Sequence, residues 1–294
     1  MKTIALASGK GGAGKTSVAA ALGAAFGLQG INADCDVDAA NGAIALGARI
    51  MSSEDYWAGE GYAINASACS SCGACALACR FDAIARTASA YAIDEALCER
   101  CGACVDLCPS GAVLAHDKLG GALYVSKTRW DSTLVHAELV PGEDTSGKLV
   151  RAVRQRAEAI AAAANPPIEA IIIDAPPGIG CPVIASLSGV DLTVVVIEAG
   201  SSGVRDAARL FELLSGMKRA AIAVINKAGI DAYWDAQARG LAEAWNAPLI
   251  AVLPWDKRFR LSTERGEAWC HSPDVFVAGQ ARSLYSAVRS AAAL

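Results

Sequence analysis

The sequence predicts an α/β fold, a doubly wound and mostly parallel sheet, into which a smaller α+β domain is inserted. Short apolar runs alternate with helix-compatible segments through most of the 294 residues, as in parallel sheets with crossover helices. A glycine-rich stretch, residues 8–17, separates the first such run from the first helix, and eight of the 11 cysteines lie within residues 69–108. We therefore expect residues 1–60 and 119–294 to form the α/β domain and residues 61–118 to form the insert.

The composition bounds the classes of protein to consider. A hydrophobic content of 53% against 19% charged residues allows a large core, and a net charge of −4 argues against a nucleic-acid partner. No apolar run reaches the roughly 18 residues that a membrane span needs, so we expect no membrane partner. The N-terminal segment is a strand that leads into the glycine-rich stretch rather than a signal peptide. Many cysteines outside a short secreted chain indicate a reducing compartment, the cytoplasm.

The glycine-rich stretch fits a phosphate-binding loop because it joins a strand, Ile4–Ala7, to a helix, Val18–Leu28. Glycines let successive backbone N–H groups turn toward phosphate oxygens, and the helix N-terminus adds the positive end of its dipole. Lys15 is expected to reach the β- and γ-phosphates and the Thr16 hydroxyl to bind Mg²⁺. The alternative is a turn without a ligand. The residues of this loop expected to bind ATP are Gly9, Lys10, Gly11, Gly12, Ala13, Gly14, Lys15, Thr16 and Ser17.

Lys10 lies inside the loop, directly after Gly9, and goes beyond the general phosphate-loop pattern. Loops that read Lys-Gly-Gly-x-Gly-Lys-Thr resemble the deviant phosphate loop of the MinD, ParA, Mrp and nitrogenase iron protein superfamily. The resemblance implies an ATP-dependent sandwich dimer, either a homodimer or a heterodimer with a related ATPase, in which Lys10 reaches the partner's nucleotide. A solvated loop lysine is the alternative.

Three carboxylates alternate after the second predicted strand, at Asp34, Asp36 and Asp38. Such a loop is most often a solvated turn, but ligands of open α/β sheets gather at the carboxyl ends of strands. In the superfamily this segment is switch I, so the resemblance implies that Asp36 orients the attacking water and that Asp34 contacts the Mg²⁺ shell. Lys10, Lys15 and Asp36 are thus the expected catalytic residues, and Asp38 has no assigned role.

A second acidic strand end occurs at Ala170–Asp174, which resembles a Walker B element and places Asp174 near Mg²⁺. The Pro176–Gly178 segment that follows resembles switch II. Cys181 follows Asp174 at the spacing of a bridging-cluster ligand in nitrogenase iron protein. The second cysteine that such a cluster needs is missing from this sequence, so we expect Cys181 to be a buried structural cysteine. The residues that family position implies at the adenine are Asn226, Lys227 and Pro254.

The rest of the α/β domain continues as alternating elements. The last helix has an apolar face and few basic residues, so we expect it to cover the sheet rather than bind a membrane. The expected strands are 119–125, 133–139, 193–199, 220–226 and 249–253, and the expected helices are 149–164, 204–215, 233–245 and 277–293.

The insert carries one cysteine pattern twice, with the second copy 29 residues after the first. Each copy reads Cys-x₂-Cys-x₂-Cys-x₃-Cys, the bacterial ferredoxin spacing, in which three cysteines bind one [4Fe–4S] cluster and the fourth binds the other. Zinc sites usually use two separated cysteine pairs, so zinc is the weaker alternative. Arg80 replaces the usual proline after the first copy, which affects the local turn and the potential rather than ligation. The expected ligand sets are Cys69, Cys72, Cys75 and Cys108 for one cluster and Cys98, Cys101, Cys104 and Cys79 for the other.

As a whole, the chain resembles MinD/Mrp-type ATPases with an inserted two-cluster ferredoxin domain. The resemblance implies an ATP-hydrolysing protein that couples nucleotide state to low-potential electron transfer to a redox partner or cofactor. A second interpretation is an Mrp-like carrier for cluster or metallocofactor assembly, and a third is a MinD-like positioning ATPase. A glutamine-hydrolysing relative of the cobyrinate amidases would need a catalytic Cys–His site, which only the sequence neighbours Cys270 and His271 suggest.

Overall fold

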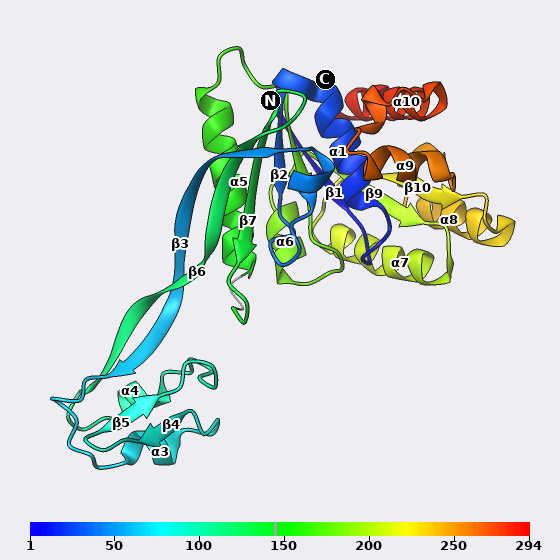
Figure 1. Ribbon diagram of the computed structural model, residues 1–294. Coiled ribbons are helices and arrows are strands. Elements are labelled where there is room, and N and C mark those ends of the chain that lie inside the picture. Colours follow the sequence, from blue (N-terminus) through cyan, green and yellow to red (C-terminus); the bar gives the residue numbers. More distant parts are fainter. Residues whose placement is uncertain (144–145) are drawn as a thin grey trace. The chain divides into compact units, whose positions relative to one another are not determined.

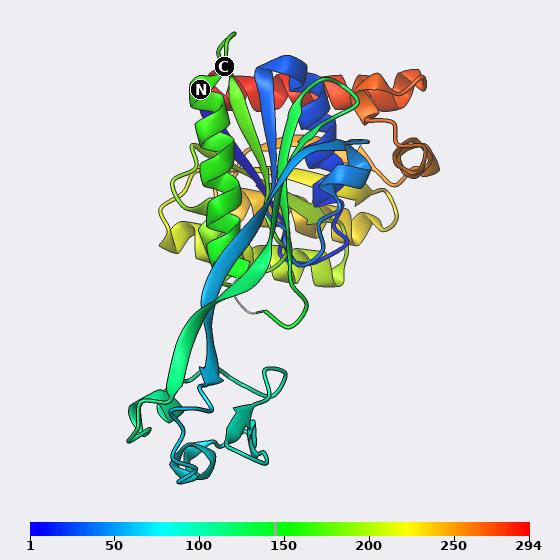
Figure 2. The ribbon, with the colours of Figure 1, turned by 60° about the vertical axis from the view of Figure 1, so that its left-hand side comes forward.

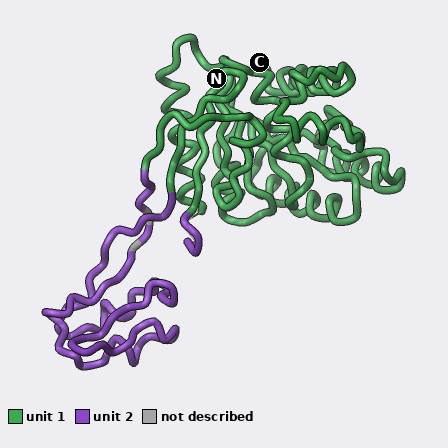
Figure 3. The backbone as a smooth tube through the Cα atoms, viewed as in Figure 1, with its two compact units in different colours: residues 1–54, 122–139, 146–294 green, residues 55–121, 140–145 purple. Residues whose placement is uncertain are grey.

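The computed structural model describes residues 1–143 and 146–294, and the chain divides into two compact units (Figure 3). Unit 1 comprises residues 1–54, 122–139 and 146–294, and unit 2 comprises residues 55–121 and 140–145. The insert predicted at residues 61–118 falls within the range of unit 2. Unit 2 also takes in residues 140–145, for which the sequence predicts a place in the α/β domain.

Unit 1 is built on a sheet of order β11-β10-β9-β1-β8-β2-β7-β6-β3 (Figure 1). Every neighbouring pair from β11 to β7 is parallel, so the carboxyl ends of these strands lie along one edge. The strands of this sheet are β1 (Lys2–Ala7), β2 (Gly30–Asp34), β3 (Arg49–Ile64), β6 (Val113–Lys127), β7 (Thr133–Leu139), β8 (Ala170–Asp174), β9 (Leu192–Glu198), β10 (Ala221–Ala228) and β11 (Leu249–Pro254).

Helices cover both faces of the sheet because alternate strand residues point to opposite sides. The core on one face joins α1 and α10 to β1, β8, β9 and β10 through fully buried residues such as Ile4, Val194 and Leu284. On the other side α5 packs against β7 and β2, and α7 packs against β9. Figure 2 gives a second view of these layers. The helices of unit 1 are α1 (Lys15–Phe26), α2 (Gly42–Ala45), α5 (Ser146–Ala163), α6 (Cys181–Leu187), α7 (Ser201–Gly216), α8 (Ala232–Ala244), α9 (Lys257–Glu264) and α10 (Val275–Ala292), with 3₁₀ turns at Gly27–Gln29 and Trp269–His271.

Two expectations about this unit can be checked directly. The predicted apolar face of the last helix is confirmed, because Val277, Ala281, Leu284 and Val288 are all buried in the core. The expectation of a buried Cys181 is wrong, because its side chain is exposed at the first residue of α6. That short helix buries a different side, which carries Val183 and Leu187. Within the described residues, no helix combines the length and apolar character that crossing a bilayer requires.

Unit 2 is built from two copies of one small motif. Besides residues 55–64 of β3 and 113–121 of β6, its regular elements are two short helices, α3 (Ala74–Ala78) and α4 (Ala103–Asp106), and an antiparallel pair, β4 (Ile84–Arg86) with β5 (Tyr91–Ile93). Gly73 and Gly102, which precede the helices, both have φ 76°. The repeat extends to hydrogen bonds, since Asn65 N donates to Ala112 O at 2.8 Å and Asp94 N donates to Ala83 O at 2.7 Å. The unit is therefore an internal structural duplication.

Candidate functional site

The glycine-rich loop lies at the carboxyl end of β1, between the ends of β8 and β9. Gly14 adopts φ 88° at the N-cap of α1, a left-handed conformation that glycine tolerates without strain. Gly9 is needed for a different reason, because a Cβ there would lie 2.7 Å from the backbone nitrogen of Ala207 in α7 and closer still to Asp206. The loop is thus fixed by both its backbone angles and its packing on α7.

Lys15 and Asp174 form a buried ion pair at the centre of the site. Lys15 Nζ lies 2.5 Å from Asp174 Oδ1, and their side chains are only 5% and 8% exposed. The other oxygen, Asp174 Oδ2, is buried and accepts no hydrogen bond from any residue that the structure describes. A buried carboxylate oxygen without a partner is costly in the free protein and suits a cation.

Asp34 lies beside Asp174, since β2 and β8 pair with these two residues in register. Asp34 Oδ1 accepts from Asp36 N at 3.1 Å and Oδ2 accepts from Gly42 N at 2.8 Å, so both of its oxygens have backbone donors. Burial, and then the charge of Asp174, raise the pKa of Asp34 to about 7. These contacts let Asp34 hold the loop between Asp36 and Gly42 from within the fold.

Asp36 and Asp38 separate in the structure. Asp36 lines the pocket in front of the loop, whereas Asp38 is exposed. Burial raises the pKa of Asp36, and the nearby Lys15 ammonium opposes that shift. The structure therefore brings Lys15, Asp34, Asp36 and Asp174 to one place and leaves Asp38 outside it.

Lys10 is held within its own chain by a cluster of charges. Its Nζ lies 2.5 Å from Glu198 Oε2 and donates to Ser202 Oγ at 2.9 Å. Glu198 also pairs with Lys227 Nζ at 3.3 Å, and Lys227 donates to Gly12 O at 2.7 Å. Burial alone would raise the pKa of Glu198, but Lys10 and Lys227 outweigh it and hold that pKa below its usual range. Glu198 thus links both lysines to the end of β9.

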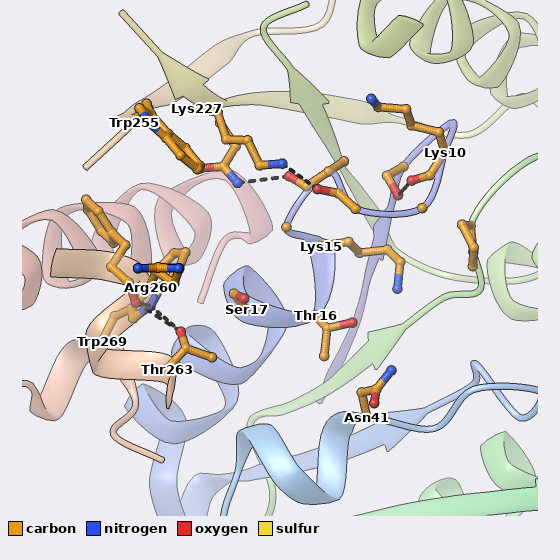
Figure 4. A pocket seen from close by; sticks show the side chains of 18 of the residues that line it. Lys10, Lys15, Thr16, Ser17, Asn41, Lys227, Trp255, Arg260, Thr263 and Trp269 are labelled. Carbon is orange, nitrogen blue, oxygen red and sulfur yellow. Dashed lines mark hydrogen bonds between the residues drawn. The ribbon is translucent and has the colours of Figure 1, made fainter. Parts of the chain in front are cut away.

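The pocket beside the loop has a volume of about 600 Å³, which suits a nucleotide-sized ligand. Figure 4 shows Lys10, Lys15 and Thr16 at the loop and Trp255 and Trp269 on the opposite wall. Of the residues expected at the adenine, Asn226, Lys227 and Pro254 all line the pocket. Asn226 also supports the loop directly, because its Nδ2 donates to Ala13 O at 2.8 Å.

Several pocket residues were not anticipated from the sequence. They come mainly from α9 and the turn after it, where Trp269 Nε1 donates to Thr263 Oγ1 at 3.1 Å. No short motif marks them, whereas Trp255, which directly follows Pro254 where family position implies that the base packs, lines the pocket as expected. Among the unanticipated lining residues are Ala39, Asn41, Asp256, Phe259, Arg260, Thr263, Glu264 and Trp269.

Comparison with known proteins identifies the family. Residues 4–269 match the CobQ/CobB/MinD/ParA nucleotide binding domain. The chain belongs to this family. An uncharacterized protein of Methanocaldococcus jannaschii is 35% identical over 238 residues, which cover 78% of this chain and 79% of the relative. The protein is therefore a ParA/MinD-family P-loop ATPase.

Solved structures agree with this fold. MinD of Pyrococcus furiosus has a TM-score of 0.58 at 19% identity and covers 99% of each chain. The septum site-determining protein MinD of Pyrococcus horikoshii, complexed with Mg-ADP, has a TM-score of 0.57 at 18% identity, with 99% of this chain and 97% of that chain covered. The predicted doubly wound α/β class is thereby confirmed as an α/β P-loop NTPase fold with a mixed, largely parallel sheet.

In this ParA/MinD-family ATPase, unit 2 contains two cavities lined by cysteines. One is lined by Cys69, Cys72, Cys75 and Cys108, and no charged residue among those described lines it. Ala112 N donates to Cys108 Sγ at 3.2 Å, and hydrogen bonding from Ser110 lowers the pKa of Cys108 to about 7, which favours the thiolate. The fourth cysteine of the second copy thus lies with the first three of the first copy.

The other cavity has the reciprocal arrangement. It is lined by Cys98, Cys101, Cys104 and Cys79, together with Glu99 and Arg100. Around both cavities, the part of the chain that the structure describes contains no group of three or more His, Cys, Asp or Glu residues that could hold a metal ion.

Proposed function

We propose that the protein is an ATP-hydrolysing iron–sulfur protein of the cytoplasm that couples its nucleotide state to low-potential electron transfer to a partner protein or cofactor. The observation that carries the iron–sulfur half is the pair of cysteine-lined cavities, whose quartets exchange their fourth members between the two sequence copies. That exchange is the ligand pattern of two-cluster ferredoxins. The family supports the ATPase half.

The residues present fit ATP with Mg²⁺. The loop amides from Gly11 to Ser17 and the Lys15 ammonium would hold the phosphates, and the Trp255 side of the pocket would take the base. Thr16 and the unpartnered oxygen of Asp174 are the candidate ligands for Mg²⁺. Asp34, which pairs in register with Asp174, would contact the Mg²⁺ shell. Asp36, at the edge of the pocket, would orient the attacking water. Mg²⁺ would supply charge stabilisation of the transferring phosphoryl group.

The cysteine cavities fit two [4Fe–4S] clusters. In a cubane each thiolate binds a different iron atom, so four sulfurs must surround a volume, whereas a zinc site draws them to one ion. The lining of four cysteines in each cavity supports the first arrangement, and an apolar cluster in the same unit contains Cys75 and Cys104. N–H donors such as Ala112 would stabilise the charged sulfurs. The clusters, when bound, would supply one-electron redox chemistry.

Dimerisation is part of the proposal because Lys10 would complete the nucleotide site of a second ATPase subunit. In the single chain Lys10 is bound to Glu198 and Ser202. Its side chain is 26% exposed, so it is accessible for exchange to another acceptor. We propose that ATP-dependent pairing of two subunits takes Lys10 from Glu198.

The test is an anaerobic purification followed by iron and acid-labile sulfide analysis and redox titration with ADP and with a non-hydrolysable ATP analogue. We expect about eight irons per chain, from two cubanes of four, and a cluster potential or rate of electron delivery that depends on the nucleotide. The Lys15→Ala variant should keep its iron and lose the nucleotide dependence. Colourless protein with bound zinc would exclude the redox half, and ATP turnover unaffected by Lys15→Ala would exclude the ATPase mechanism.

One observation favours cluster carriage as a second candidate function. Cys72 and Cys101, which occupy equivalent positions in the two copies, are the exposed members of their quartets. An exposed ligand offers an entry point for an acceptor thiol, as a cluster or metallocofactor assembly carrier of the Mrp type would need. Rapid transfer of cluster to an apo-ferredoxin would support the carrier, whereas retention during many ATP turnovers would support electron transfer.

A further inference from the structure

Two side chains at the end of β10 hold the phosphate loop by its carbonyl groups. Lys227 Nζ donates to Gly12 O at 2.7 Å (Figure 4). Its sequence neighbour Asn226 donates from Nδ2 to Ala13 O at 2.8 Å. A loop whose N–H groups turn inward toward a phosphate turns its carbonyls outward, and those carbonyls need donors of their own. The contacts from β10 therefore help to fix the shape of the loop.

The backbone of Lys227 is unusual for a residue near the end of a strand. Its φ is 59°, in the left-handed region that a lysine seldom adopts. The register of β10 with β11 also shifts between Ile225 and Ala228, so the strand is irregular around Lys227. Such conformations cost free energy and persist where the surrounding structure enforces them. This cost points to a role for the Lys227 ammonium beyond packing.

Glu198, at the end of the neighbouring strand β9, is the shared ion-pair partner of Lys10 and Lys227. Its Oε2 lies 2.5 Å from Lys10 Nζ, and its Oε1 lies 3.3 Å from Lys227 Nζ. One carboxylate thus faces two ammonium groups, and the closer one, that of Lys10, neutralises most of its charge. Lys227 is left with the longer ion pair and the short hydrogen bond to Gly12 O.

The position of Glu198 is fixed by packing as well as by charge. A Cβ on Gly203 of α7 would lie 2.8 Å from the Cβ of Glu198, so α7 covers the stem of this side chain closely. Asn226 pairs with Glu198 in register on the neighbouring strand, and Ala199 N donates to Asn226 O at 3.0 Å. The carboxylate therefore has little room to follow either lysine, and a change at one lysine acts on the other.

Removal of Lys10 from this cluster would change how the loop is held. Without Lys10, the full charge of Glu198 would attract Lys227, because no second cation would then offset that charge. Lys227 would move toward the carboxylate and away from Gly12 O. The Gly12 carbonyl would lose part of its donor, and the loop would hold a phosphate less firmly.

We propose that Glu198 is a positioning residue that couples Lys10 to the hold of Lys227 on the phosphate loop. While Lys10 is bound to Glu198, Lys227 supports Gly12, and when Lys10 turns to the nucleotide of a second subunit that support weakens. The biological meaning of this coupling rests on the proposed dimer, whereas the coupling itself is a property of one subunit. The role assigned to Lys227 differs from the contact with adenine that family position implies.

The experiment is a double-mutant cycle that measures the Kd for Mg-ADP by calorimetry, because subunit pairing is proposed with ATP only. Lys10→Met should weaken ADP binding in two ways, by loss of a charge near the phosphates and by loss of support at Gly12. In the Lys227→Met or Glu198→Gln background only the first effect remains, so the effect of Lys10→Met on Kd should be about two- to fivefold smaller. Lys227→Arg keeps a cationic donor and should restore the full effect.

A matched control and a second measurement accompany the cycle. Lys218 is exposed after the end of α7, and Lys218→Met should have the same effect on Kd in every background. Hydrogen–deuterium exchange at saturating ADP should become faster in residues 9–14 when Lys10→Met is made in the wild type, and should not change in residues 170–174. In the Glu198→Gln background, Lys10→Met should leave exchange in residues 9–14 unchanged.

The outcomes separate this inference from the proposed function. Equal effects of Lys10→Met in all backgrounds, or Lys227→Arg that behaves like Lys227→Met, would overturn the coupling. If Glu198→Gln does not fold, the cycle with Lys227→Met decides. The measurements need neither iron nor a second subunit. Lys10→Met protein that still pairs with ATP would contradict the dimer role of Lys10, and iron-free protein would contradict the redox role, while the cycle would still test the coupling.

Discussion

Replacing Gly9 by alanine tests how the phosphate loop is fixed. The added Cβ would meet the backbone of Asp206 and Ala207 in α7, with the Ala207 nitrogen at 2.7 Å and the Asp206 carbonyl closer. A comfortable contact between such atoms is about 3.5 Å, so the loop or the helix would have to move by roughly 1 Å. Backbone atoms cannot turn aside as a flexible side chain can. The same substitution at Gly11 meets no atom of the described residues within 4 Å.

The expected magnitude follows from that overlap. Insertion of an atom into a well-packed site costs about 1–3 kcal/mol, and we place Gly9→Ala near the upper end. For a chain of this size, about 3 kcal/mol corresponds to a fall in Tm of roughly 6–12 °C. Gly11→Ala should stay within about 1 kcal/mol of the wild type, because the loss of glycine entropy in the unfolded chain is its main effect.

Differential scanning calorimetry without nucleotide measures this difference, and titration with a fluorescent ATP analogue then measures how far the displaced loop loses affinity. A Gly9→Ala variant as stable as Gly11→Ala would refute the close approach of the loop to α7. An equal fall in both variants would also refute it, because the loop would then reject any side chain regardless of its surroundings.

Three further substitutions test the Lys10–Glu198 ion pair, the buried carboxyl of Asp34 and the pocket wall formed by Trp255. Glu198→Gln should let ATP-dependent dimers form at about 1.4- to 5-fold lower protein concentration in light scattering, since a partly exposed pair of about 0.2–1 kcal/mol no longer holds Lys10. The pKa of Asp34 rises from 3.8 to about 7 on folding, so the folded carboxyl keeps a proton that the unfolded chain loses in that window. Urea unfolding without Mg²⁺ should therefore find the wild type losing stability relative to Asp34→Asn as the pH rises from about 4 to about 7. Trp255→Ala should raise the Kd for ATP by roughly 5- to 150-fold, as lost stacking of about 1–3 kcal/mol predicts, in a fluorescence titration.

Matched control substitutions separate these effects from a general loss of folding stability. Glu212, an exposed acid of α7, is the control for Glu198, and its amide variant should dimerise like the wild type. Trp57 is 59% exposed against 60% for Trp255, and Trp57→Ala should leave ATP affinity unchanged. A stability difference between wild type and Asp34→Asn that does not vary with pH would contradict the raised pKa of Asp34.

The elements that the sequence predicts best are those with buried apolar runs. The strand expected at residues 133–139 coincides with β7, and the acids expected at the ends of the second strand and of residues 170–174 lie side by side as Asp34 and Asp174. The long strand β3 was not predicted. Its start carries exposed apolar residues such as Ile50 and Met51, so no alternation of buried and exposed positions marks it.

The contacts that lie outside the motifs could not be predicted from sequence. Glu198 follows Lys10 by 188 positions, and Glu143, which forms an ion pair with Arg100, follows it by 43. Neither acid belongs to a short pattern, and only the folded chain brings each to its lysine or arginine. The cysteine repeat is visible from its spacing, yet its extension to Tyr62-Ala63-Ile64 and Tyr91-Ala92-Ile93 becomes meaningful only through the matching backbone of the two copies.

Both loop lysines are neutralised by acids of the same chain, and this has a consequence for how the site accepts a ligand. A phosphate that draws Lys15 away would leave Asp174 and Asp34 as neighbouring buried carboxylates, and the raised pKa of Asp34 already reflects the charge of Asp174. Two such charges are tolerated only with a proton or a cation between them. The unpartnered oxygen of Asp174 offers that cation a place. The residues of this chain thus favour a triphosphate that arrives with its divalent cation over one that arrives alone.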